Sequence, residues 1–115
     1  MPATLETLAA IPYSASMTPN CVLGEYQTIT VTNATAMTIN APTNFKVGQW
    51  LIIEFFNNSG GAMGAVTCNA AFLNGGAGTV GTGAVTNPAT GKRRTIGFKY
   101  NGTNWTEQFR STADM

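Results

Sequence analysis

From Tyr26 onward the sequence alternates between apolar and polar residues with a period of two. Successive side chains of a β-strand point to opposite faces at this spacing. In the segment that begins at Tyr26, the side chains of Ile29 and Val31 fall on one face. Thr28 and Thr30 fall on the other, and these β-branched residues suit the pleated surface of a sheet. The alternation therefore predicts an all-β domain with half-exposed strands.

Two pairs of alternating segments are predicted to form β-hairpins. Residues 26–32 and 35–40 are separated by Asn33 and Ala34, which indicate a turn. Residues 95–100 and 103–110 flank Asn101-Gly102, the dipeptide typical of a type I′ hairpin turn. With a two-residue turn, Phe98 pairs with Trp105, and Ile96, Tyr100 and Phe109 share their face. Glu107 then falls on the apolar face, where Arg94 is placed to neutralise it.

The segment 49–57 is apolar on both of its predicted faces. Leu51, Ile53 and Phe55 lie on one face. Trp50, Ile52 and Phe56 lie on the other. A strand of this kind is either central in a two-layer structure or covered on its outer face by another subunit.

Residues 1–24 fit neither the strand period nor the helix period, although they contain several apolar residues and three prolines. We interpret them as an extended N-terminal arm that contacts a neighbouring subunit. Residues 25–115 are predicted to form a single antiparallel β-sandwich or jelly-roll-like domain. The predicted partner-binding residues are Leu5, Leu8, Ile11, Tyr13, Trp50 and Phe56.

Charge and composition argue against several classes of partner. Only 10% of the residues are charged, against about 25% in a typical globular protein, and the net charge is +1. A chain without a strong positive field is predicted not to bind nucleic acid. Its short apolar runs and its N-terminus predict neither a membrane span nor export. Cys21 and Cys68 are therefore expected to be buried free thiols and not to form a disulfide with each other.

Enzymatic chemistry finds little support in the residue types present. The sequence has no histidine, which excludes histidine-activated nucleophiles and removes the commonest metal ligand. Gly76–Gly81 matches a dinucleotide-binding motif in its letters, but no helix is predicted after it. We therefore predict a protein that is not an enzyme, with no catalytic residues, no cofactor and no metal.

Four segments together resemble the small β-sandwich modules of tailed-bacteriophage particles. Such modules are found in capsid decoration (cement) proteins and in tail or head fibres. The resemblance covers about 80 residues of this chain. Its residues are Thr28–Thr32, Val47–Trp50, Asn57–Gly60 and Phe98–Trp105.

The resemblance implies a viral structural protein that stabilises a capsid by binding the major capsid protein. It further implies a homotrimer on the capsid surface, made in the host cytoplasm before assembly into the virion. Two other functions stay open. The first is a receptor- or glycan-binding fibre module that uses Trp105, Tyr100 and the Gly-rich loop. The second, less favoured, is a polysaccharide hydrolase with Glu54 and Glu107 as its carboxylate pair.

Overall fold

The computed structural model describes residues 9–74, 79–80, 85–111 and 113–115, which contain ten strands and one 3-10 helix. In this part of the chain strands predominate and helix is almost absent, which confirms the predicted all-β class. In chain order the elements are β1 (Ala9–Ala10), β2 (Ser16–Met17), η1 (Cys21–Leu23), β3 (Tyr26–Val31), β4 (Met37–Ile39), β5 (Trp50–Asn57), β6 (Val66–Cys68), β7 (Phe72–Asn74), β8 (Thr79–Val80), β9 (Arg93–Tyr100) and β10 (Trp105–Arg110).

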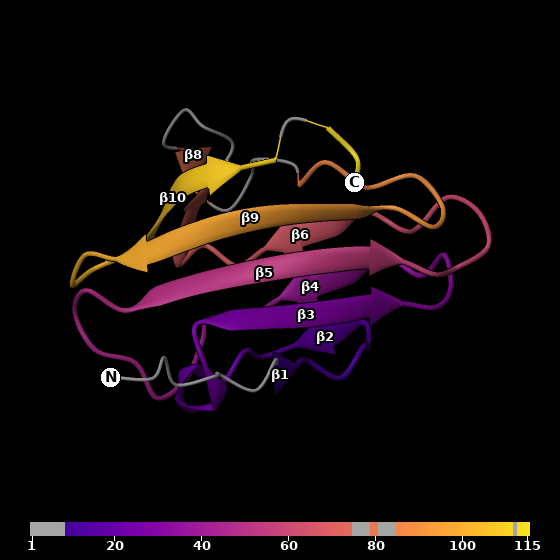
Figure 1. Cartoon of the computed structure of the whole chain (residues 1–115). Helices are drawn as coiled ribbons and strands as arrows, with labels where there is room; N and C mark the ends of the chain where they lie inside the picture. Colours follow the sequence, from indigo (N-terminus) through magenta and orange to yellow (C-terminus); the bar gives the residue numbers. More distant parts are fainter. Residues whose placement is uncertain (1–8, 75–78, 81–84, 112) are drawn as a thin grey trace, which may run out of the picture.

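The strands form two sheets that lie one behind the other (Figure 1). The large sheet has seven strands in the order β1-β3-β5-β9-β10-β7-β8. The small sheet has three strands in the order β2-β4-β6. Buried side chains from both sheets form one hydrophobic cluster, so the core lies between the two layers.

From β1 to β6 the chain passes alternately through the large and the small sheet, so that it follows three turns of a coil. Strands of successive turns pair in parallel. The register stacks Met17, Ile39 and Cys68 in one column of the small sheet, and all three side chains are buried. Each turn of the coil thus contributes one inward-pointing residue to this column, at the same height along the strands.

The parallel coil corrects two sequence-based predictions. Five of the eight strand pairings among the described residues are parallel, so an antiparallel arrangement holds only around β9 and between β7 and β8. The predicted hairpin of 26–32 with 35–40 is wrong, because β3 and β4 belong to different sheets. At the corner between them, Asn33 Oδ1 accepts hydrogen bonds from the Thr35 backbone N–H at 2.9 Å and the Tyr13 hydroxyl at 2.6 Å.

Residues 9–24 also differ from the predicted arm, because they form the first turn of the coil. β1 pairs with β3, and β2 pairs with β4. Ile11, Met17 and Cys21 are buried in the common core. Strands of two residues are too short to show a period in the sequence, so the alternation does not reveal β1 and β2. Residues 1–8, including Leu5 and Leu8, lie outside the described residues.

The hairpin of β9 and β10 is present, but its register differs from the prediction by two residues. Trp105 pairs with Tyr100 across a four-residue connection, 101–104. Asn101 Oδ1 accepts hydrogen bonds from the backbone N–H groups of Thr103 and Asn104, at 2.9 and 2.8 Å, which stabilises this longer loop. A shift of two residues keeps the side chains up to Glu107 on their predicted faces, so Phe98 and Trp105 are both buried in the core.

Both cysteines are free thiols buried in the core. Burial raises the pKa of each thiol to about 11, because the charged thiolate is disfavoured away from water. Cys21 and Cys68 therefore act as small apolar core residues in this fold.

Candidate interaction face

The side of the large sheet that points away from the core carries a continuous group of half-buried and exposed side chains, here called the outer face. It is formed by the central strands of that sheet, β3, β5, β9 and β10 (Figure 1). Its members are Tyr26, Thr28, Thr30, Trp50, Ile52, Glu54, Phe56, Arg93, Thr95, Lys99 and Phe109.

β5 supplies the apolar centre of the outer face, as its two-sided sequence predicts. Leu51, Ile53 and Phe55 point into the core and are at most 1% exposed. Trp50 and Phe56 alternate with them and are half-buried on the opposite side. The small sheet packs against the other side of β5, so these two predicted partner-binding residues both lie on the outer face, near opposite ends of the strand.

Charged side chains lie over the aromatic rings of the outer face. The Arg93 guanidinium carbon lies 4.1 Å from the centre of the Phe56 ring, and Lys99 Nζ lies 5.5 Å from that of Trp50. Both contacts have cation–π geometry. Glu54 lies between these pairs, with its carboxylate 3.5 Å from Arg93 Nε. The charged side chains of the outer face thus lie directly beside its aromatic rings.

Glu54 also accepts a 2.6 Å hydrogen bond from the hydroxyl of Tyr26 on the neighbouring strand. Partial burial and the adjacent carboxylate raise the pKa of the Tyr26 hydroxyl, because both disfavour its anion. The hydroxyl therefore stays protonated and fixes the position of the carboxylate on the face.

Phe109 is an outer-face residue that sequence reasoning assigned to the core side. The pairing register shifts between Glu107 and Phe109, and this irregularity turns Phe109 to the same side as Gly97. A Cβ atom on Gly97 would lie 2.2 Å from the Phe109 ring, so any larger residue at this position would displace the ring from its place over the strand. The ring remains 44% exposed. The alternating pattern of a sequence does not reveal a bulge. A glycine within a strand, here Gly97, is the one sequence feature that indicates such an irregularity.

Ile11 and Tyr13, the other predicted partner-binding residues that the structure describes, are not part of the outer face. Ile11 is 6% exposed and belongs to the core of its own domain, so it does not provide an exposed contact. The partly buried ring of Tyr13 packs against that core, and its hydroxyl binds the corner at Asn33.

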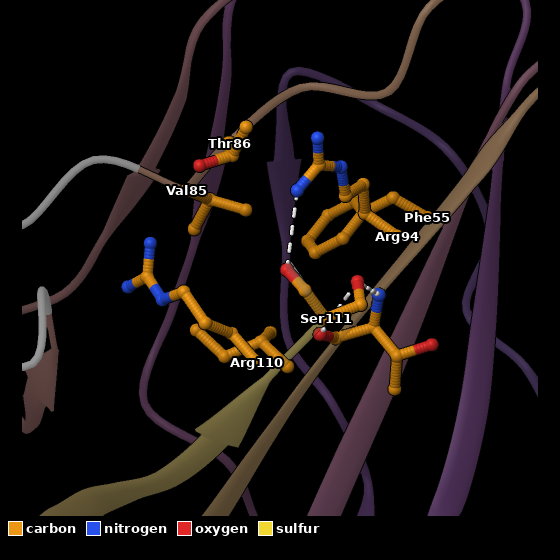
Figure 2. Close-up of a pocket in the computed structure, with 8 residues that line it drawn as sticks. Phe55, Val85, Thr86, Arg94, Arg110 and Ser111 are labelled. Carbon is orange, nitrogen blue, oxygen red and sulfur yellow. Dashed lines mark hydrogen bonds between the residues drawn. The ribbon is translucent and has the colours of Figure 1, made fainter. Parts of the chain in front are cut away.

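A small pocket lies where β5, β9 and the end of β10 meet residues 85–86 (Figure 2). Its volume of about 10 Å³ is room for about one water molecule. Figure 2 shows Arg94 and Arg110 extending beside it. Arg94 Nε lies 2.6 Å from Asp114, and Arg110 Nε lies 2.6 Å from Glu107. The predicted pairing of Arg94 with Glu107 is therefore wrong, and both guanidinium groups are neutralised within the chain.

The residues named for the two alternative functions are not arranged as those functions require. Trp105 is 1% exposed, so its ring is not available to stack on a sugar. The Gly-rich loop falls largely outside the described residues. Glu54 lies on the outer face, whereas Glu107 pairs with the buried Phe98 on the core side of the same sheet. The two carboxylates therefore do not flank one substrate.

The described residues offer neither a cluster of metal ligands nor a membrane-spanning helix. They contain no group of three or more potential metal ligands among histidine, cysteine, aspartate and glutamate. Within the same part of the chain, no helix is long and apolar enough to cross a membrane.

Comparison with known proteins gives no family for the chain. No protein-family model matches it, and a search of curated proteins returns no similar sequence.

Proposed function

We propose that this chain is a structural subunit of a virus particle, a capsid decoration protein that binds the major capsid protein through its outer face. The observation that carries the proposal is the group of half-exposed aromatic residues on β5 and β10, with Trp50, Phe56 and Phe109 on one side of one sheet. An apolar aromatic surface on a rigid sheet is the kind of surface that partners bury.

The chemistry of the face suits a protein partner. Aromatic and arginine side chains dominate the binding energy of protein interfaces, and Arg93 lies directly over Phe56. The threonines Thr28 and Thr30 add hydroxyl groups beside the aromatic centre without adding charge. Most of the face is carried by paired strands, so docking requires little backbone ordering.

The resemblance of four segments to phage particle modules supplies the viral context of the proposal. Within that context the subunit sits on the capsid surface after synthesis in the host cytoplasm, and its attachment stabilises the shell. The parallel coil is compatible with this role, because it presents a broad sheet face from a chain of only 115 residues.

The number of copies per particle tests the proposal. A decoration protein follows the lattice of the shell, so quantitative mass spectrometry of purified particles should find tens to hundreds of copies. The ratio to the major capsid protein in the same sample provides the internal standard. A handful of copies per particle would indicate a fibre or a minor component and would reject the decoration role.

A further inference from the structure

One end of the coil carries most of the exposed apolar side chains of the described residues. At this end the chain passes twice from the small sheet to the large sheet, through η1 after β2 and through residues 40–49 after β4 (Figure 1). Four of the six large apolar residues that are exposed in the described part of the chain lie on these two connections. They form a surface here called the end patch, made of Val22, Leu23, Phe45 and Val47.

The two connections lie side by side, so the end patch spans adjacent turns of the coil. Asn20 and Thr43 form a parallel bridge, and the Cys21 backbone N–H donates a 3.0 Å hydrogen bond to the Thr43 carbonyl. The Asn44 side-chain amide donates a further hydrogen bond, of 2.9 Å, to Asn20 Oδ1. These bonds fix the backbone under the end patch, so that binding a partner requires little additional ordering.

Two charged side chains beside the end patch have no partner within the chain. Glu25 follows η1, and Lys46 lies between the two apolar residues of the second connection. Both are exposed, and within the described residues neither side chain makes an ion pair or a hydrogen bond. The other three acidic side chains in this part of the chain each pair with an arginine. The end of the coil thus combines exposed apolar residues with one unpaired charge of each sign.

We propose that the end patch binds the end patch of a second copy of this chain, around a two-fold axis that runs between the two connections. In this arrangement η1 of one copy lies over residues 43–47 of the other, and the same contact is made a second time with the roles exchanged. Glu25 then faces the partner's Lys46, and Lys46 faces the partner's Glu25. The proposal does not depend on the proposed function, because the end patch is separate from the outer face.

The charges are the reason for a second copy as the partner. Exposed apolar side chains gain from burial on any apolar surface, so they alone do not identify what binds there. One acidic and one basic group on adjacent connections, in contrast, make a surface that is complementary to itself after a half-turn. A two-fold axis along the row of connections would instead place Glu25 beside the partner's Glu25. Like charges side by side are costly in an interface, which selects the axis between the connections.

The same axis leaves the outer faces of both copies accessible. It runs from the small-sheet layer to the large-sheet layer, so the large sheets of the two copies meet end to end. Both outer faces then point to the same side of the pair. Such a pair can attach to one surface at two places, and the second attachment is favoured because it is intramolecular.

The contact is small, which predicts a weak pair in solution. The molecule is only 25 Å across in its smallest dimension, and the two connections occupy part of one end. The contact is therefore smaller than the roughly 800 Å² per partner of a standard interface and belongs to the weak class. We expect a dissociation constant of about 10–100 µM, so that the chain is monomeric at about 1 µM.

Sedimentation equilibrium of the purified full chain, from about 1 µM to about 1 mM, tests the proposal without any virus particle. The mass should rise from the 12.1 kDa of one chain toward twice that value. Glu25→Lys or Lys46→Glu puts like charges opposite each other, and the two-fold axis repeats the effect. Each variant alone should therefore pair at least about 10-fold more weakly. An equimolar mixture of the two variants should regain pairing, because opposite charges then meet at both contacts of a mixed pair.

Two further variants complete the test. Lys92→Glu makes the same change of charge at an exposed position next to Asn57, at the opposite end of β5, and should pair like the unchanged chain. Val47→Asp changes a side chain that is 71% exposed, so it should keep the circular dichroism spectrum while it weakens the pair at least about 10-fold.

The mixture separates the proposal from a folding defect, because two misfolded variants would not restore each other. Monomers over the whole concentration range, a trimer, or a mixture that pairs no better than its components would overturn the proposal. The number of copies on particles is measured independently. A high copy number together with any of these results would keep the role of the outer face and remove only the pair.

Discussion

Deleting residues 1–24 should unfold the domain. The deletion removes β1 and β2, the edge strands of the two sheets at this end of the coil, and takes Ile11, Met17 and Cys21 out of the core. Full burial of such side chains contributes about 1.5–3 kcal/mol each. The loss of three therefore approaches the roughly 5–15 kcal/mol that separates folded from unfolded states in a typical domain.

Thermal and urea denaturation followed by circular dichroism measure this effect, and a matched pair of point variants locates it. Met17→Ala removes a buried side chain and should lower the free energy of unfolding by about 2–5 kcal/mol. Val22→Ala changes a side chain that is 72% exposed, so its effect should be within about 0.5 kcal/mol. A truncated chain that melts cooperatively at the temperature of the full chain would show that the first turn is dispensable.

The two tryptophans should respond very differently to substitution by alanine. Trp105 is 1% exposed and its ring centre lies 5.2 and 5.3 Å from those of Tyr100 and Phe45. Trp105→Ala therefore leaves a large cavity in the core, at a cost of about 3–5 kcal/mol. Trp50 is half-buried on the outer face, where truncation leaves no enclosed cavity, and Trp50→Ala should cost less than half as much.

Urea titrations of the two variants provide the comparison, with the tryptophan that remains as the fluorescent probe in each. The urea midpoint for Trp105→Ala should fall well below that for Trp50→Ala. Equal midpoints would mean that the outer face is as important to the fold as the core, and Trp50 would no longer be a surface residue held for binding.

The sequence predicts the position and the facing of most strands but not their partners. Alternation identifies β3, β4, β5 and β9, because a residue pattern with one buried face fixes which side chains point inward. The same pattern is satisfied by parallel and antiparallel neighbours, so the hairpin of β3 and β4 could not be distinguished from two turns of a coil. Pairing is decided by the connections and by the packing of the whole chain.

In the candidate site, too, the local sequence pattern predicts some residues, whereas others depend on how the whole chain packs. Trp50 and Phe56 are placed on an outer face by the two-sided sequence of β5, and the structure keeps them there. Phe109 joins them only because the pairing register shifts next to it, a tertiary feature with no local period. The burial of Ile11 could not be predicted for the opposite reason: it directly follows β1, a strand of only two residues that shows no period in the sequence.

A measurement of attachment to virus particles tests most directly whether the outer face binds the capsid. Particles that lack the protein are incubated with the unchanged chain or with one of two double alanine variants, and the bound protein is quantified. Trp50→Ala with Phe56→Ala removes two rings from the outer face, whereas Thr38→Ala with Thr67→Ala changes the outward side of the small sheet. The account predicts that the first variant loses most of its attachment while the second binds like the unchanged chain. Full attachment of the first variant would contradict it.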